Sequence, residues 1–227
     1  MKKRLDQYSG RLSAVQIAEG INLARRNASR LAADSASLLD AGRLPSATAL
    51  AVLAIEEAGK CSILREIALA RDERELLEAW RSYRSHTTKN RTWLFVELFF
   101  KGARKLNDFA PLFSSASDHP YLLDQIKQIS FYTDCLGDAH WSYPEDVIDA
   151  DLCKSLVFTA SILGKGDNIT PREIELWIQH VGPVWRSHPE RMEKSLTDWY
   201  ASLQAEGLKP HGKNAMRSYI LEGFGKE

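Results

Sequence analysis

The chain has 227 residues, 44% of them hydrophobic and 26% charged, which suits one large globular domain and argues against extensive disorder. Its 30 basic and 30 acidic residues balance, so the protein lacks the positive coat that non-specific nucleic-acid binding requires. Three widely spaced cysteines predict reduced thiols. Since no apolar run forms a secretory signal or a membrane span, we expect a cytoplasmic protein with no membrane association.

Helical patterns dominate from the N-terminus, and strand signals are almost absent from the sequence. A first helix is predicted from Ser13 to just before Gly42, because apolar residues recur there at three- and four-residue steps. A second helix is predicted from Pro45 to about Arg71. Its first half, SATALAVLAI, is apolar on every side, which places this helix in the middle of a bundle.

The rest of the chain is also predicted to be helical. A third helix is expected to begin near Asp72 and either to continue or to restart through TWLFVELFFKGARKL. A fourth is expected around YLLDQIKQISFYTD, and the loop CLGDAHWSY follows it. Three later segments each open with proline in the first helical turn, where its missing N–H is tolerated. They are PEDVIDADLCKSLVFTASIL, TPREIELWIQHV and PERMEKSLTDWYASLQAEG.

These elements predict an all-α fold, an antiparallel helical bundle with extra C-terminal helices. We expect residues 1–165 to form the bundle and residues 166–227 to form a helical extension that packs on it. Proline and glycine recur after about residue 208, so that part of the chain is predicted to be a loose tail.

Two carboxylates, Glu56 and Glu57, directly follow the apolar run of the second helix, where an unpaired charge would be costly. Lys60 lies four and three residues further on, so it can neutralise either carboxylate on the same helix surface. One interpretation is a structural ion pair where the helix leaves the core. The alternative is that a carboxylate positions a cation on a neighbouring helix.

The stretch WRSYRSHTTKNR, residues 80–91, is basic and contains no acid. It is either a solvated helix face or a site for a phosphate group. Arg81 and His86 favour the second interpretation, because a guanidinium binds phosphate through two parallel hydrogen bonds and a histidine can move a proton near neutral pH. On a regular helix their side chains would point about 140° apart. The pair therefore requires a helix break near Ser85 or a contribution from a second subunit.

Other motifs give weaker support for a functional site. The stretch EDVIDAD, residues 145–151, could be a carboxylate cluster for a metal, but acids in the first turn after Pro144 are explained by the helix dipole. The sequence also lacks the glycine-rich phosphate loops and the serine-hydrolase motif. We therefore predict no metal and no cofactor.

Several stretches, read in chain order, resemble the AbiV family of abortive-infection proteins, which belongs to the HEPN superfamily of helical bundles. The stretches are NASRLAADSASLL, RLPSATALAVLAIEEAGK, WRSYRSHTTK and IKQISFYTDC, followed by WSYP. The EE-x-GK block after the apolar run is the most specific of them. The resemblance covers roughly residues 20–165, and the C-terminal segment has no such likeness.

The resemblance implies a HEPN four-helix fold, a homodimer and antiphage defence in which the infected cell stops its own growth or translation. In ribonuclease members of the superfamily, an arginine and a histidine separated by four to six residues lie at a dimer groove. They cleave RNA without a metal and use the RNA 2′-hydroxyl as nucleophile. Arg81 and His86 fit this spacing as the catalytic pair.

In that reading Glu56 or Glu57 holds a basic group in place, and Lys60, Arg84 and Lys89 support the site or contact phosphate. The alternative is a non-catalytic protein that binds a phage or host protein and blocks translation by occupancy. Ser82 favours this alternative, because active members commonly carry Asn, Asp or His directly after the motif arginine. RNA and a phage-encoded protein trigger are the partners that the two readings imply.

Overall fold

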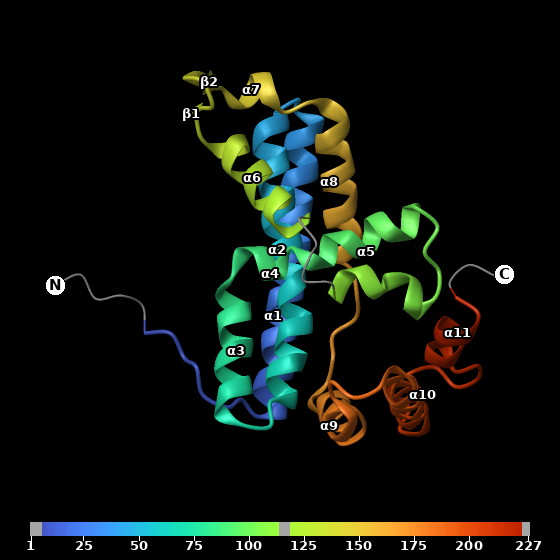
Figure 1. Cartoon of the computed structure of the whole chain (residues 1–227). Coiled ribbons are helices and arrows are strands. Elements are labelled where there is room, and N and C mark those ends of the chain that lie inside the picture. The colour runs from blue at the N-terminus through green and yellow to red at the C-terminus, as the bar shows by residue number, and fades with distance from the viewer. Residues whose placement is uncertain (1–5, 114–118, 224–227) are drawn as a thin grey trace.

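The computed structural model describes residues 6–113 and 119–223 and is all-helical apart from one small hairpin. A long antiparallel pair, α1 (Ala14–Asp40) and α2 (Leu44–Leu69), forms its axis (Figure 1). A capping box opens α1, because the Ser13 hydroxyl accepts from the Gln16 N–H and the Gln16 side chain accepts from the Ser13 N–H. Gly42 has a φ of 72°, the left-handed conformation expected after a helix end. Both predicted helices are confirmed.

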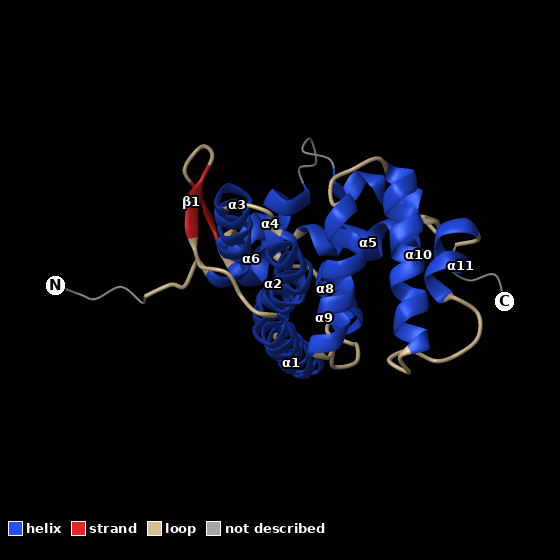
Figure 2. Cartoon of the chain, turned by 90° about the horizontal axis from the view of Figure 1, so that it is seen from below, coloured by secondary structure: helices blue, strands red, loops and turns tan. Residues whose placement is uncertain are grey.

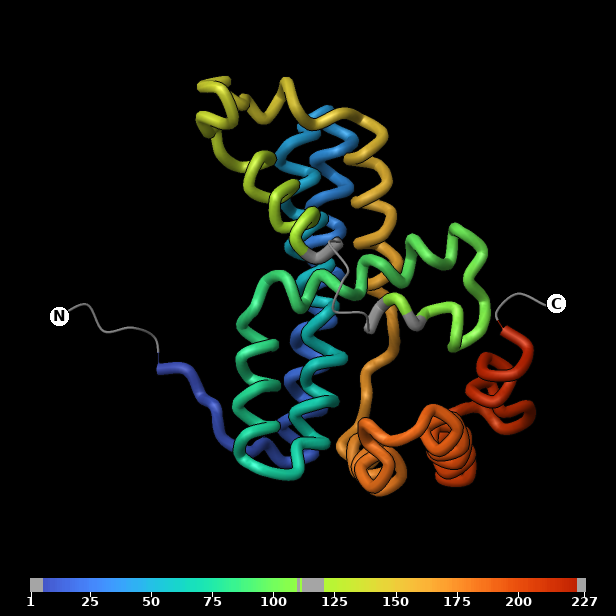
Figure 3. Tube along the Cα trace, in the orientation of Figure 1, coloured from blue at the N-terminus to red at the C-terminus, as the bar shows by residue number. Residues whose placement is uncertain are grey.

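Shorter elements surround this pair, and Figure 3 traces the chain through them. In the bundle they are α3 (Glu73–Arg84), α4 (His86–Lys89), α5 (Arg91–Phe100), the 3₁₀ helix η1 (Leu106–Phe113), α6 (His119–Phe131), α7 (Pro144–Val147) and α8 (Ala150–Leu163). In the C-terminal part they are α9 (Pro171–Val181), the 3₁₀ helix η2 (Gly182–Val184), α10 (Pro189–Ala205) and α11 (Ala215–Leu221). The predicted all-α class is thereby confirmed.

Two apolar clusters fill the interior, one on each half of the α1–α2 pair. In the first, residues of α6 and α8 such as Leu123 and Leu156 pack against Ile55 of α2. In the second, Trp80 of α3 and Ile174 of α9 pack against the other half of the pair. Because α2 contributes to both clusters, its apolar residues are buried on every side, as its sequence predicts.

The C-terminal helices α10 and α11 lie beside the bundle, on the side opposite the hairpin, in both Figure 1 and Figure 2. The segment after residue 208, predicted to be loose, contains α11. The side chain of Asn214 caps this helix by accepting from the Arg217 N–H at 2.9 Å. A second anchor is Gln204, whose amide donates to the Pro210 carbonyl at 2.7 Å.

Two further segments differ from the sequence-based expectation. The predicted loop before Pro144 contains a hairpin, in which β1 (Asp134–Leu136) pairs with β2 (His140–Ser142). The segment after Pro144, predicted as one helix, is divided into α7 and α8. Asp149 causes the division, because its side chain accepts from the N–H groups of Asp151 and Leu152 and so begins a new helix.

Candidate functional site

Glu56 lies on α2 between the two apolar clusters. Its neighbour Ile55 belongs to the first cluster, and Cys61, five residues after Glu56, belongs to the second. Only 3% of the Glu56 side chain is exposed. A carboxylate buried to this degree is costly unless cations and hydrogen bonds compensate it.

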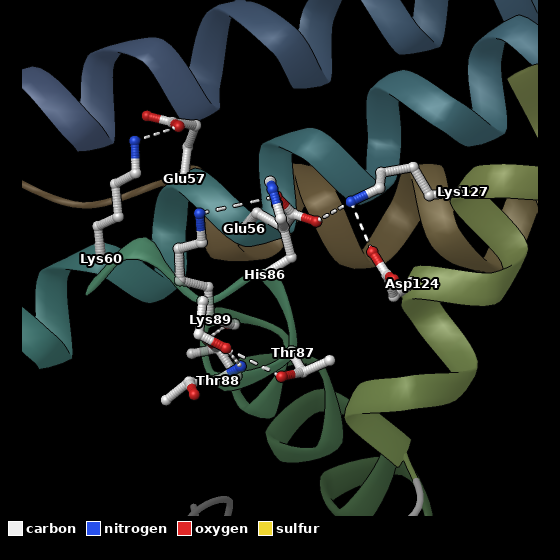
Figure 4. A network of polar contacts seen from close by, with 11 residues as sticks. Glu56, Glu57, Lys60, His86, Thr87, Thr88, Lys89, Asp124 and Lys127 are labelled. Atoms are coloured by element: carbon white, nitrogen blue, oxygen red, sulfur yellow. Dashed lines mark hydrogen bonds and ion pairs between the residues drawn. The ribbon is translucent and has the colours of Figure 1, made fainter. Parts of the chain in front are cut away.

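Three basic side chains from two other helices surround this carboxylate (Figure 4). His86 Nδ1 lies 2.7 Å from one oxygen, Oε2, and Lys127 Nζ donates to the other, Oε1, at 2.7 Å. Lys89 Nζ lies 3.9 Å from Oε2. Lys127 also pairs with Asp124 Oδ1 at 2.8 Å. We call these five residues the Glu56 cluster.

The two glutamates therefore have different partners. Glu56 pairs with basic side chains of α4 and α6, so it is a carboxylate that positions cations on neighbouring helices. Glu57 pairs with Lys60 on the same helix, so it forms the structural ion pair that the sequence also allowed. The Lys60 ammonium also lies 5.4 Å from the centre of the Tyr83 ring, so this pair borders the cluster and packs against α3.

The pKa values of the two lysines of the cluster are shifted in opposite directions. Burial lowers the pKa of Lys89, and the nearby Glu56 carboxylate only partly opposes this change. Burial alone would also lower the pKa of Lys127, but hydrogen bonds to Asp124 and Glu56 raise that pKa above its ordinary value. Lys127 is thus the firmly charged partner of Glu56.

A helix break presents His86 to this carboxylate. Helix α3 ends at Arg84, Ser85 is extended (φ −76°, ψ 125°), and α4 begins at His86. The Ser85 hydroxyl accepts from the Thr88 N–H at 3.3 Å and so caps α4. The helix is therefore broken at Ser85, which is the first of the two alternatives that the sequence left open, and the 140° separation of a regular helix does not apply to Arg81 and His86.

The imidazole of His86 is held on one side and exposed on the other. An ionised carboxylate only accepts hydrogen bonds, so the contact with Glu56 places the ring proton on Nδ1. In the neutral imidazole the second nitrogen, Nε2, is then an acceptor, and 59% of the side chain is exposed. A histidine oriented by a carboxylate in this way is suited to take a proton from a bound molecule.

Gly59 allows α4 to approach α2 this closely. A Cβ atom at this position would lie 2.1 Å from the Lys89 carbonyl oxygen and 2.8 Å from Thr92 Oγ1. No other residue type fits there without a backbone shift. The close approach of α4 therefore explains why the EE-x-GK block has glycine at position 59, which the spacing of the block does not explain.

The other predicted site residues lie around the cluster. Arg81, in the last turn of α3, is exposed. The Arg84 guanidinium donates to the Tyr8 carbonyl and lies 5.3 Å from the centre of the Trp80 ring, so it faces the N-terminal segment. The Lys89 side chain is only 8% exposed and faces Glu56. Among the predicted residues, Arg81 and His86 are the exposed ones, which makes them available to a bound molecule.

Sequence reasoning missed Asp124 and Lys127. A weak signal exists, because Lys127 is four residues after the buried Leu123 and so falls on the apolar face of α6. The described residues also bear on two other features, a metal site and a membrane-spanning helix. Within the described residues, no three His, Cys, Asp or Glu side chains converge as a metal site. No helix in the same residues is both long and apolar enough to cross a membrane.

The chain thus forms a helical bundle with a buried glutamate beneath an exposed histidine, and an arginine in the last turn before the helix break. The chain belongs to the HEPN_AbiV family, whose family model, described as AbiV, matches residues 16–165. This match confirms the resemblance and covers α1 to α8, whereas α9 to α11 lie outside it. No curated protein and no solved structure matches the chain.

Proposed function

We propose that the protein acts in antiphage defence by abortive infection, and that it cleaves RNA without a metal at a groove shared by two copies of the chain. Membership of the AbiV family supports the first part. The second part rests on one observation, the 2.7 Å contact between Glu56 Oε2 and the Nδ1 atom of an exposed His86. That contact leaves Nε2 as the proton acceptor that phosphodiester cleavage needs.

The chemical step follows from this orientation. His86 Nε2 removes the proton of an RNA 2′-hydroxyl, and the resulting oxygen attacks the adjacent phosphorus. The bond from phosphorus to the 5′-oxygen breaks, which gives a 2′,3′-cyclic phosphate and a 5′-hydroxyl. The departing 5′-oxygen takes its proton from a protonated histidine. Arg81 stabilises the negative charge that develops on the phosphoryl oxygens.

Two subunits supply what one chain lacks. The step needs a histidine and an arginine at one phosphate, and we propose that the exposed His86 of one chain works there with the exposed Arg81 of the other. A two-fold axis brings the same surface of two copies together and so doubles both groups. We therefore propose a homodimer whose interface includes α4 and the end of α3. A protein that sediments as a monomer at micromolar concentration would count against the shared groove.

The decisive experiment is RNA cleavage by the purified protein in the presence of a metal chelator. We expect cleavage by the wild type, and a loss of about 10²–10⁴-fold in rate for His86→Ala, the range typical of acid–base groups. Arg81→Lys should recover little of the loss in Arg81→Ala, because an ammonium cannot form the bidentate contact. The matched controls are His211→Ala and Arg74→Ala, which remove an exposed histidine and an exposed arginine of α3.

A second candidate, binding to a phage or host protein without catalysis, is favoured by an exposed apolar surface. The surface lies on α6 and the hairpin beside a groove of about 770 Å³, and Trp141 is 77% exposed. Its other large exposed side chains are Tyr121, Leu122, Phe131, Tyr132 and Leu136. Exposed apolar groups in this number are typical of interaction sites. Wild-type protein that leaves RNA intact, with a His86→Ala variant that still protects cells from phage, would select this candidate.

A further inference from the structure

A second polar site lies away from the Glu56 cluster, between the bundle and the C-terminal helices. It is a pocket of about 130 Å³ lined by basic residues from three parts of the chain. Arg25 comes from α1, Arg65 from α2, and Lys209 from the segment that follows α10. The indole of Trp199, on α10, forms another part of the wall.

Two hydrogen-bond donors of this pocket have no acceptor. Within the described part of the chain, the Arg65 guanidinium forms no hydrogen bond or ion pair, and the buried Trp199 Nε1 has no hydrogen-bond partner. Burial lowers the pKa of Arg65. Buried donors in proteins normally have partners, so the unpaired Trp199 Nε1, beside an Arg65 guanidinium that no acceptor among the described residues engages, indicates an absent acceptor.

The acids of the pocket do not supply that acceptor. Glu173 Oε2 accepts from the Thr170 N–H at 2.6 Å, and Oε1 lies 3.3 Å from Lys209 Nζ. Both oxygens are therefore engaged in capping α9 and in binding the lysine. Asp167 is exposed and contributes its backbone carbonyl, which accepts a hydrogen bond from the Arg25 guanidinium.

The size of the pocket limits the ligand. A volume of about 130 Å³ is small and accommodates one tetrahedral oxyanion. Two guanidinium groups, an ammonium and an indole N–H approach from different elements. Such a set suits the several oxygens of a phosphate better than the two oxygens of a carboxylate.

We propose that the pocket formed by Arg25, Arg65, Trp199 and Lys209 binds a phosphate group, either free phosphate or the monoester end of a small molecule. A bound phosphate gives Arg65 and Trp199 the acceptor that they lack. It also links α1 and α2 to α10, and so fastens helices outside the family match to the bundle. The site is distinct from the Glu56 cluster and does not depend on RNA cleavage.

Isothermal titration of the full chain with inorganic phosphate, at constant ionic strength set with chloride, tests this site. We expect one phosphate per chain, and affinity at least about tenfold weaker in Arg65→Gln, because a charge-assisted contact is lost. Arg25→Gln should act similarly, while Arg26→Gln, an exposed neighbour on α1, should bind as the wild type does. Trp199→Phe keeps an aromatic ring but removes the pyrrole part of the indole with its N–H, so it should weaken binding by roughly fivefold.

Three further arms separate the alternatives. Adenosine monophosphate binding more tightly than inorganic phosphate would identify a monoester as the ligand, and the reverse order would identify free phosphate. Acetate should not compete for the site. Arg81→Ala should retain binding, which distinguishes this pocket from the proposed RNA groove. The proposal is overturned if the wild type takes up no phosphate at millimolar concentration, or if folded Arg65→Gln and Trp199→Phe bind it with unchanged affinity.

Discussion

Glu56 and Glu57 are adjacent in sequence and differ in what they hold, so their replacement should have different costs. Glu56→Ala leaves Lys89 buried without its carboxylate and Lys127 with Asp124 alone, and should reduce the free energy of unfolding by about 3–5 kcal/mol. Glu57→Ala leaves Lys60, whose side chain is 19% exposed, free to turn toward water and should cost about 1 kcal/mol or less. Urea unfolding at pH 7 measures both changes. Equal losses of unfolding free energy in the two variants would show that Glu56 does not stabilise the buried lysines.

The composition of this site was only partly predictable from the sequence. Two carboxylates directly after an apolar run predict paired charges, and the Arg81–His86 spacing singles out the histidine. Lys127 lies 71 residues from Glu56, and helix periodicity carries no information about contacts over such a distance. The assignment of Lys60 to Glu57 and of His86 to Glu56 likewise depends on how α4 packs against α2.

At the scale of elements, the approach of α4 to α2 depends on Gly59. In Gly59→Ala the new methyl group meets the Lys89 carbonyl, which is backbone and cannot rotate away. We expect a loss of about 1–3 kcal/mol in unfolding free energy, the usual cost of overpacking. RNA cleavage should fall as well, because the shift of α4 moves His86 away from Glu56.

Gly20→Ala is the matched control for that change. A Cβ at Gly20 would meet only the end of the Leu64 side chain, at 3.3 Å, which can adjust. Alanine in the middle of α1 also has a better helix propensity, worth about 0.5–1 kcal/mol. The control should therefore be neutral or slightly stabilising in thermal unfolding. A Gly59→Ala protein as stable as this control would contradict the steric argument.

The start of α3, the helix that carries Arg81, provides a pH test. Hydrogen bonds from the Arg71 side chain and backbone lower the pKa of Glu75 to about 2, whereas its ordinary value is 4.5. A carboxyl group with a lowered pKa stabilises the fold above its unfolded pKa, and this stabilisation disappears as the pH falls through the folded pKa. The stability difference between wild type and Glu75→Gln should therefore be constant above about pH 5 and shrink between pH 4.5 and 2. Urea unfolding at several pH values measures it, and a difference independent of pH would remove Glu75 from this role.

The long helices were predictable and several short elements were not, for a physical reason. Helices α1 and α2 carry periodic or continuous apolar residues over many turns, with Ser13 and Gly42 at the ends of α1. The hairpin has strands of three residues, too short for an alternating pattern, and its turn uses Ala139 at a positive φ of 63°. The division between α7 and α8 depends on a single capping side chain, Asp149.

For the whole molecule, the boundary at residue 165 remains a proposal about how the sequence is organised. Ile169 and Ile174, which follow it, pack into the same apolar cluster as Ile21 and Leu64. Helix α9 therefore covers part of the core of the bundle. The proposed phosphate pocket lies at the same junction.

The pooling of sites across a dimer can be tested by mixing two inactive variants. Arg81→Ala and His86→Ala each lack one group, but a mixed dimer has one site with both wild-type residues if Arg81 of one chain works with His86 of the other. With random exchange half of the dimers are mixed and each has one intact site, so roughly one quarter of wild-type cleavage should return. Differently tagged variants, purified in tandem, establish that mixed dimers form. Confirmed mixed dimers without any recovery of RNA cleavage would show that Arg81 and His86 act within one chain. The proposed interface along α4 would then not form a shared active site.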